Sequence, residues 1–337
     1  MYEIRLCKID EIKLLTTFLN DSWAQNHIFV RDMDLLDFQH KSDTRYNFVV
    51  AYHVESNSFH GVLGIGSPDF YVDRRIEKNQ DVWLAIWKVD KRLTKASSLG
   101  MDMLSYVQTK FQPTSISAIG INKTVAFLYK AMGFKTKTMN QWFIPNRNIV
   151  ESKLIVGDLP DLMCDSEVYS HSTIECGIEQ ENELQIFLSK NKAKRTFRYI
   201  VERYLNHPSY KYLIYAIVKA DSNIHAVVVG RKVSANGASA FRLTELFYEL
   251  DCALDVKDGL IEIMVQKGYE YIDFLEYGFD VKALVSSGFI QCSDNLFVPH
   301  FFEPFDADRQ EVKIAFRSKE PFSCTKGDSD LDRPNQG

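Results

Sequence analysis

The sequence has few of the features that mark fibrous, disulfide-stabilised or membrane proteins. Only 16 of its 337 residues are glycine and 9 are proline, which is too few for a collagenous or low-complexity chain. No apolar run reaches the roughly 18 residues that a membrane-spanning helix needs. The cysteines are far apart and include no Cys-x-x-Cys pair, which argues against a zinc site and against a disulfide scaffold (Cys7, Cys164, Cys176, Cys252, Cys292 and Cys324).

What the sequence does contain is typical of a globular protein with a substantial core. Apolar residues make up 45% of the chain and charged residues 25%, and the length suggests two domains. The formal net charge is −5, which argues against general nucleic-acid binding. Residues 1–5 begin a strand pattern without the apolar segment of a signal peptide. We therefore expect a cytoplasmic protein with no membrane insertion and no nucleic-acid partner.

The first half of the chain alternates predicted strands and helices. Alternating or continuous apolar patterns predict strands, and apolar residues at helical spacing predict helices, the first of them with Asp10 as N-cap. The predicted strands cover residues 2–7, 47–54, 61–66, 81–89, 115–121 and, as a closing strand, 141–144. The first predicted helix begins at Asp10, and the others cover 32–40, 99–111 and 123–132.

The second half repeats this order. Helices are predicted over 181–190, 195–206, 255–267 and 281–287, and strands over 210–219, 226–233, 240–248, 269–275 and through Phe297. Although any two α/β units share such an order, its consistency favours a duplication. We predict an α/β (α+β) fold of two tandem units, each a mixed, mostly antiparallel sheet flanked by helices.

Turn-forming residues indicate where the two units meet. Proline, asparagine, aspartate and glycine accumulate between Pro145 and Ser172. We therefore expect one domain over residues 1–148 and another over 149–322. The polar residues 323–337 are expected to form a disordered tail.

A loop before the helix at 99–111 has the composition of a phosphate-binding site. It reads Lys95-Ala96-Ser97-Ser98-Leu99-Gly100-Met101. Unpaired N–H groups at a helix N-terminus bind phosphate, and glycine permits close approach. The alternative is a helix N-terminus with no ligand.

A second motif follows at fixed spacing: Asn122, then Tyr129, then Gly133-Phe134. Together with the loop, it resembles the GNAT (Gcn5-related N-acetyltransferase) superfamily, over residues 2–145 and more faintly over 170–320. Lys95 stands where the family has glutamine or arginine, and Ser98 replaces its first glycine. The resemblance implies two GNAT-like domains and acetyl-CoA (acyl-CoA) as co-substrate, with no metal. The residues implied to bind the cofactor are Lys95, Ser97, Ser98, Leu99, Gly100, Met101, Asn122 and Val89.

The same resemblance implies that Tyr129 is the general acid that protonates the departing thiolate of CoA. A phenol is neutral at pH 7 and close enough in acidity to a thiol to deliver a proton. The alternative is a tyrosine packed in the core. Asn122 either bonds the pantetheine arm or caps its helix, whereas Gly133 is expected at the helix C-terminus and Phe134 in the core.

The acceptor amine must lose a proton, and His27 is the candidate base because its ordinary pKa is near neutral. The alternative is a structural histidine. Asp81 and Glu245 are strand residues that either bind a sugar hydroxyl or face solvent. Acidic residues in the second-half loop at 250–257 oppose pyrophosphate binding. We therefore expect the second domain to be degenerate for CoA and to contribute to the acceptor site.

The chain as a whole resembles two-domain GNAT-like proteins of bacterial surface-polysaccharide clusters. That resemblance implies that the small-molecule partner is an amino sugar or a nucleotide-linked amino sugar. Its amine would attack the thioester directly and receive the acyl group. Two alternatives remain: an aminoacyl-tRNA-dependent Fem-like transferase, and a non-catalytic duplicated module that binds a ligand.

Overall fold

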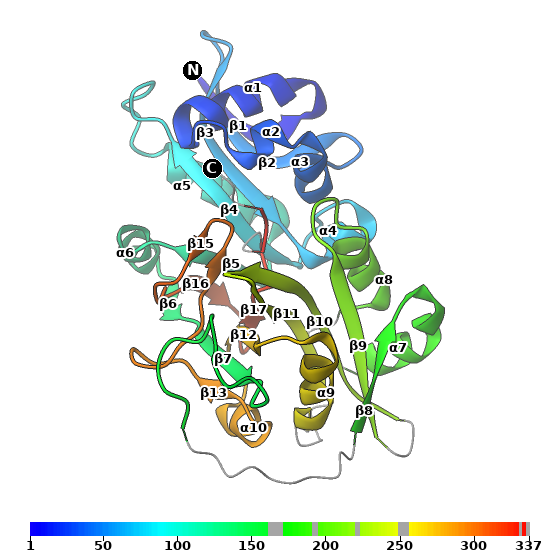
Figure 1. Ribbon diagram of the computed structural model, residues 1–337. Coiled ribbons are helices and arrows are strands. Elements are labelled where there is room, and N and C mark those ends of the chain that lie inside the picture. The colour runs from blue at the N-terminus through cyan, green and yellow to red at the C-terminus, as the bar shows by residue number, and fades with distance from the viewer. Residues whose placement is uncertain (161–170, 191–194, 220–222, 249–255, 330–331, 335–337) are drawn as a thin grey trace. The chain divides into compact units, whose positions relative to one another are not determined.

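The computed structural model describes residues 1–160, 171–190, 195–219, 223–248, 256–329 and 332–334. The chain forms two compact units, and neither is a continuous segment (Figure 1). The first contains Met1–Lys137, Val312–Phe322 and Asp328–Gly337, and the second contains Thr138–Glu311 and Ser323–Gly327.

The first unit is built on a seven-stranded sheet with the order β1-β2-β3-β4-β5-β16-β6. Neighbouring strands β1 to β4 are antiparallel, β4 and β5 are parallel, and β16 is antiparallel to β5. The strands are β1 (Tyr2–Lys8), β2 (Arg45–His53), β3 (Ser58–Gly66), β4 (Asp81–Val89), β5 (Ser115–Ile121), β16 (Lys313–Ser318) and β6 (Lys135–Thr138).

Helices cover both faces of this sheet, which explains why β2 is an almost continuous apolar run. On one face, Phe48 and Val50 are buried in a cluster with Leu15, and on the other face Val49 is buried in a cluster with Met103. The first face is covered by α1 (Ile12–Phe18), α2 (Ile28–Arg31) and α3 (Met33–His40), and the second by α5 (Leu99–Phe111) and α6 (Lys123–Ala131).

The second unit has a sheet with the order β13-β7-β12-β11-β10-β9-β8. Read from β8, this order matches the first sheet strand for strand, and the fourth and fifth strands, β11 and β12, again pair in parallel. The prediction of mixed, mostly antiparallel sheets flanked by helices is therefore confirmed. The elements are β8 (His171–Cys176), β9 (Tyr212–Lys219), β10 (Ile224–Ala235), β11 (Ala238–Tyr248), β12 (Tyr271–Tyr277), β7 (Asn140–Pro145), β13 (Ile290–Gln291), α7 (Glu181–Leu188), α8 (Phe197–Ile200), α9 (Lys257–Lys267) and α10 (Val281–Ser286).

Each sheet takes one strand from the other half of the sequence. Strand β7, which we expected to close the first unit, pairs with β12, so that Ile144 lies opposite Ile272. Strand β16 occupies the matching place in the first sheet, where Ile314 lies opposite Ile119. The expected domain limits at 148 and 322 therefore differ from the observed units, because backbone pairing carries residues 138–148 into the second unit and 312–322 into the first.

The residues expected to form a disordered tail are partly structured. Strand β17 (Cys324–Thr325) pairs with the end of β12. Further on, the Arg333 guanidinium lies 5.0 Å from the centre of the Phe29 ring within the first unit. Residues 330–331 and 335–337 lie outside the described part of the chain.

Several local predictions differ from the structure. Residues 195–206 form the short helix α8 and a π-helical turn, Val201–Leu205, rather than one helix, and the strand expected through Phe297 is a single bridge to Val156. Asp10 is not an N-cap, because it lies inside the 3-10 turn Ile9–Glu11, whose N-cap is Lys8, and Glu11 occupies the N-cap position of α1. No described helix is long and apolar enough to cross a membrane.

A buried ion pair holds a long loop against the second sheet. Arg242 on β11 and Asp273 on β12 are 2% and 1% exposed, and an Arg242 guanidinium nitrogen lies 2.8 Å from an Asp273 oxygen. Arg242 also donates to the backbone carbonyls of Pro299 and His300. Arg242 therefore holds the part of the loop just before the hairpin β14 (Phe301–Phe302) and β15 (Phe305–Asp306).

Candidate functional site

The first unit has a gap between its two parallel strands. The pairing of β4 with β5 covers Asp81 to Trp83 only, and residues 84–89 continue without a partner on that side among the described residues. A shift in the β3–β4 register between Leu63 and Ile65 marks a bulge in the same part of β4. Bulges bend a strand, and the backbone groups left along β4 can bond an extended ligand.

Trp87, Val89 and Tyr129 gather beside this gap, next to the start of α5. The rings of Trp87 and Tyr129 are 5.5 Å apart and nearly perpendicular. A Cβ atom on Gly100 would lie 3.6 Å from Trp87 Nε1 and 3.8 Å from Val89 Cγ2, which is ordinary contact. Gly100 therefore faces the same space as the end of β4, and a long side chain there would enter that space.

The loop before α5 presents unpaired backbone donors. The first bond of the helix runs from Asp102 N–H to the Ser98 carbonyl at 2.9 Å, so the amides of residues 99–101 have no partner within the helix. Lys95, Ser97 and Ser98 are exposed, whereas the Leu99 side chain is buried in the core. Leu99 and Met101 could contribute to phosphate binding only through their N–H groups. Asp102 in the first turn opposes an anion.

Tyr129 lies on α6 and is 2% exposed. Its ring also packs edge-on against Phe134, at 5.0 Å between centroids. The hydroxyl forms no hydrogen bond with a described residue and is not among the fully buried polar atoms that lack a partner, so it reaches solvent-accessible space. Burial raises the pKa of the Tyr129 phenol above its usual range. The phenol therefore stays protonated at neutral pH.

The remaining residues of this motif serve local structure. Asn122 caps α6, because its Oδ1 accepts the Val125 N–H at 2.8 Å. Gly133 has a φ of +80° just past the helix end, and the Phe134 N–H bonds the Tyr129 carbonyl at 3.0 Å. This geometry needs glycine and confirms the predicted C-terminal role of Gly133. Of the two interpretations of Asn122, the structure shows the cap.

His27 also acts as a helix cap. Its Nδ1 accepts the Phe29 N–H at 3.3 Å at the start of α2, and its ring stands edge-on to the Phe29 ring. Its role as a base stays a prediction. Asp81, the other first-half candidate, accepts hydrogen bonds from the hydroxyls of Thr114 and Ser115 at 2.8 and 2.6 Å.

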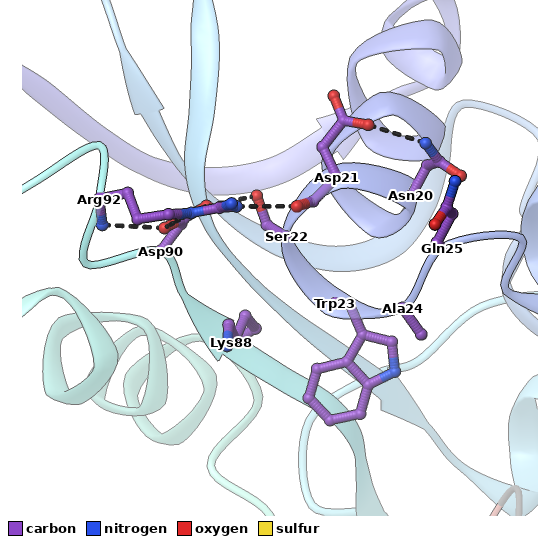
Figure 2. Close-up of a pocket in the computed structure, with 9 residues that line it drawn as sticks. All are labelled: Asn20, Asp21, Ser22, Trp23, Ala24, Gln25, Lys88, Asp90 and Arg92. Atoms are coloured by element: carbon purple, nitrogen blue, oxygen red, sulfur yellow. Dashed lines mark hydrogen bonds and ion pairs between the residues drawn. The ribbon is translucent and has the colours of Figure 1, made fainter.

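A polar cavity of about 520 Å³ lies where the π-helical turn Leu19–Trp23 meets the end of β4. In Figure 2 the indole of Trp23 and Lys88 lie below the pair formed by Asp90 and Arg92. Trp23 is 42% exposed although it is large and apolar. The residues that line the cavity are Asn20, Asp21, Ser22, Trp23, Ala24, Gln25, Lys88, Asp90 and Arg92.

Asp90 organises the wall of this cavity. Its carboxylate accepts hydrogen bonds from Arg92 Nε at 3.0 Å and from the Ser22 hydroxyl at 2.7 Å, while Arg92 donates to the Asp21 carbonyl at 2.7 Å (Figure 2). The Arg92 guanidinium holds the pKa of the Asp90 carboxyl well below its usual range. The pair therefore fixes the turn that carries Asp21 and Trp23 to the end of β4.

Comparison with known proteins gives a match in structure only. No family model and no curated protein matches the sequence. A GCN5-related N-acetyltransferase from Anabaena variabilis is similar over 94% of this chain and 72% of its own, with 10% identity and a TM-score of 0.57. A probable N-acyltransferase from Enterococcus faecalis is similar over 94% and 73%, with 10% identity and a TM-score of 0.56. This chain has the fold of the GCN5-related N-acetyltransferases.

A third solved structure with the GNAT fold is the glucosamine N-acetyltransferase region of a fungal multi-domain β-N-acetylglucosaminidase. The similarity covers 94% of this chain and 38% of that one, with 8% identity and a TM-score of 0.52. The resemblance to the GNAT superfamily that Asn122, Tyr129 and Gly133-Phe134 suggested is therefore confirmed for the fold.

The second unit differs from the first at the matching place. Its parallel pairing ends at Leu243 and Phe274. Beyond that point Glu245 is 3% exposed and accepts hydrogen bonds from the hydroxyls of Tyr204 and Tyr199 at 2.7 and 3.2 Å. Glu245 was predicted either to bind a sugar hydroxyl or to face solvent, and its burial excludes the second role. Residues 250–255 of the loop expected to oppose pyrophosphate lie outside the described residues.

The sequence reasoning missed three features of the first unit. Trp87 counted only as an apolar strand residue, and neither Trp23 nor the pair of Asp90 and Arg92 was a candidate. No short motif marks them, since an exposed tryptophan and an Asp-x-Arg segment are common. Among the described residues, no group of three or more His, Cys, Asp or Glu side chains lies close enough to hold a metal ion.

Proposed function

We propose that the protein is an acyl-CoA-dependent N-acyltransferase that uses acetyl-CoA in its first unit. The observation that carries the proposal is the gap beside residues 84–89, with unpaired amides at the start of α5 at one side and the Tyr129 hydroxyl reaching accessible space. An extended pantetheine arm can bond the free edge of β4, and the amides of residues 99–101 suit its pyrophosphate. Lys95 remains a proposed contact, and Asn122 is proposed to contact the cofactor in addition to capping α6.

The proposed reaction is direct attack of the acceptor amine on the thioester carbonyl. A new C–N bond forms, the C–S bond breaks, and the sulfur leaves with the bonding electron pair. Tyr129 donates its phenolic proton to that thiolate, and a base takes one proton from the amine. The raised pKa of Tyr129 keeps the acid in its protonated form, although it makes the transfer less downhill than from an ordinary phenol. His27 is the proposed base.

The proposed acceptor is an amino sugar, free or carried on a nucleotide, as in surface-polysaccharide biosynthesis. The cavity beside β4 has the chemistry for it: the exposed Trp23 ring offers a face for a sugar ring, and Asn20 and Gln25 offer amides for its hydroxyls. Lys88 is a partner for the phosphates of a nucleotide sugar. The fungal region of the same fold, whose name includes glucosamine N-acetyltransferase, supports this acceptor class.

Calorimetry with CoA and acetyl-CoA tests the cofactor site through Gly100. Gly100→Glu places a long anionic side chain in the space that Trp87 Nε1 and Val89 face, so we expect loss of measurable binding. Gly100→Ala is the matched control, since its Cβ makes only ordinary contacts. Unchanged affinity in Gly100→Glu would remove the site.

The acceptor is tested by thermal shift with glucosamine and with nucleotide-linked amino sugars, because a ligand that binds the native state raises the melting temperature. We expect a rise that Trp23→Ala abolishes and that Trp23→Phe largely keeps. A rise that persists in Trp23→Ala would place the acceptor outside this cavity.

A further inference from the structure

The gap between the parallel strands of the second unit contains part of the chain itself. Strand β17 runs antiparallel to the end of β12, with Thr325 opposite Glu276 and Cys324 opposite Tyr277. The Lys326 N–H then bonds the Leu275 carbonyl at 3.0 Å. On the other side, the Gly327 N–H bonds the Thr244 carbonyl of β11 at 3.1 Å. Residues 324–327 therefore bond to both diverging strands.

Side chains of the second unit hold this segment in place. The Thr325 hydroxyl donates to Glu245 Oε2 at 3.3 Å, while Glu245 Oε1 accepts from Tyr204. The Arg203 guanidinium donates to the Gly327 carbonyl. Glu245 and Arg203 are 3% and 7% exposed, so a carboxylate and a guanidinium are buried around one short peptide. A buried charge is costly unless it is hydrogen-bonded, and this segment supplies hydrogen-bond partners to both charges.

The fit is close enough to require glycine at one position. A Cβ atom on Gly327 would lie 2.8 Å from the Thr244 carbonyl oxygen and closer still to the Tyr204 hydroxyl. Both distances are shorter than van der Waals contact, and the Thr244 oxygen belongs to the backbone of a central strand. Any side chain at 327 must therefore move the segment or the sheet.

We propose that the gap between β11 and β12 is a binding site for an extended, glycine-containing peptide, and that residues 324–327 are its occupant within the same chain. The place that matches the acyl-CoA gap of the first unit is thereby filled by backbone. The second unit takes no pantetheine arm because a peptide already bonds the edges of both strands. This peptide site involves no acyl transfer and goes beyond the function proposed above.

Cys324 provides a direct measurement of occupancy, because it is 2% exposed in the filled site. We expect Gly327→Ala to displace the segment and to speed maleimide labelling of Cys324 by about tenfold, which corresponds to about 1.4 kcal/mol. Cys176, a buried cysteine of β8 in the same unit, is the internal control and should keep its slow labelling. After proteolysis, mass spectrometry of the fragments that contain Cys324 and Cys176 gives the labelling rate of each cysteine. Thr325→Val removes the hydroxyl that donates to Glu245 and accepts the Gly327 N–H but adds no side chain at position 327, so it should give a smaller rise in Cys324 labelling.

Unchanged Cys324 labelling in both variants would overturn the proposal. An equal rise at Cys176 would overturn it too, since it would mean that the whole unit opens rather than that the segment leaves its site.

A separate peptide tests whether the gap between β11 and β12 binds a ligand that is not part of the chain. A fluorescent peptide with the sequence of residues 321–329 should bind the full-length Gly327→Ala protein, measured by fluorescence anisotropy. It should not bind the wild-type protein, whose site is filled, and the same peptide with alanine at position 327 should bind neither. Failure of the native peptide to bind the variant would refute the proposal. None of these measurements uses CoA, so absence of CoA binding would refute the proposed function and leave this result unaffected.

Discussion

Replacing Tyr129 by phenylalanine removes one hydroxyl and leaves the aromatic packing in place. The ring keeps its edge-on contacts with Trp87 and Phe134, at 5.5 and 5.0 Å. The hydroxyl has no hydrogen-bond partner among the described residues, so its loss leaves no buried group unpaired. We expect the free energy of unfolding to change by less than about 0.5 kcal/mol. Tyr129→Ala, by contrast, removes the ring and should cost about 3–5 kcal/mol.

The effect on catalysis should be far larger than the effect on stability. Loss of a general acid lowers the chemical step by about 10²–10⁴-fold, which is about 2.7–5.4 kcal/mol in the barrier. In the proposed reaction the phenol takes part only as the thiolate leaves, so kcat should fall while the affinity for acetyl-CoA is kept. Because burial raises the pKa of Tyr129, the wild-type rate should show no loss from ionisation of this phenol at neutral or mildly alkaline pH.

The assay is release of free thiol from acetyl-CoA with an amino-sugar acceptor, under conditions where a burst experiment shows that chemistry limits the rate. Calorimetry with CoA and a melting curve on the same preparation separate binding and folding from catalysis. A kcat for Tyr129→Phe within a factor of about three of the wild-type value would reject the catalytic role, since even weak acid catalysis exceeds it. Tyr129 would then be a core residue.

Three further predictions concern stability. The pKa of the Asp90 carboxyl is depressed in the folded state, so its ionised form stabilises the fold above the usual pKa of about 3.9. This contribution is lost as the pH falls below that value. Asp90→Asn should therefore weaken the fall of the melting temperature at acid pH, measured as a melting-temperature profile against pH. Asp273→Asn leaves the buried Arg242 guanidinium without its counter-charge and should lower the free energy of unfolding by about 3–5 kcal/mol, measured by urea titration. A fragment of residues 1–148 should lack cooperative melting because it has no β16, whereas residues 1–137 joined by a flexible linker to 312–322 should melt cooperatively.

Local sequence patterns predicted most elements of the fold but not the pairing of the exchanged strands. Residues 141–144 are apolar enough to be recognised as a strand, and they form one. Their partner on β12 is far away in sequence, and nothing local distinguishes it from a partner on β5. Strand β16 was missed because Lys313 and Arg317 flank only three apolar residues. Partner choice depends on the whole sheet, which a short window does not contain.

The candidate site was predictable where a local rule applied. The loop before α5 and Gly133 follow from helix-end chemistry, and both have the expected backbone geometry. Trp87 became a site residue only through its position beside Tyr129, and Asp90 through the turn that brings Ser22 to it. These contacts join segments that lie far apart in the chain, so no local spacing in the sequence predicts them.

The exchange of β7 and β16 sets an order for biosynthesis. The first sheet cannot be completed until residue 318 has left the ribosome, although the strands from β1 to β5 are made long before. During that interval the edge of β5 is open, and an unpaired edge invites association with other chains. The first unit therefore remains unfinished until β16 has been made, and in a chain that ends anywhere before β16 the half that carries Tyr129 has no completed sheet.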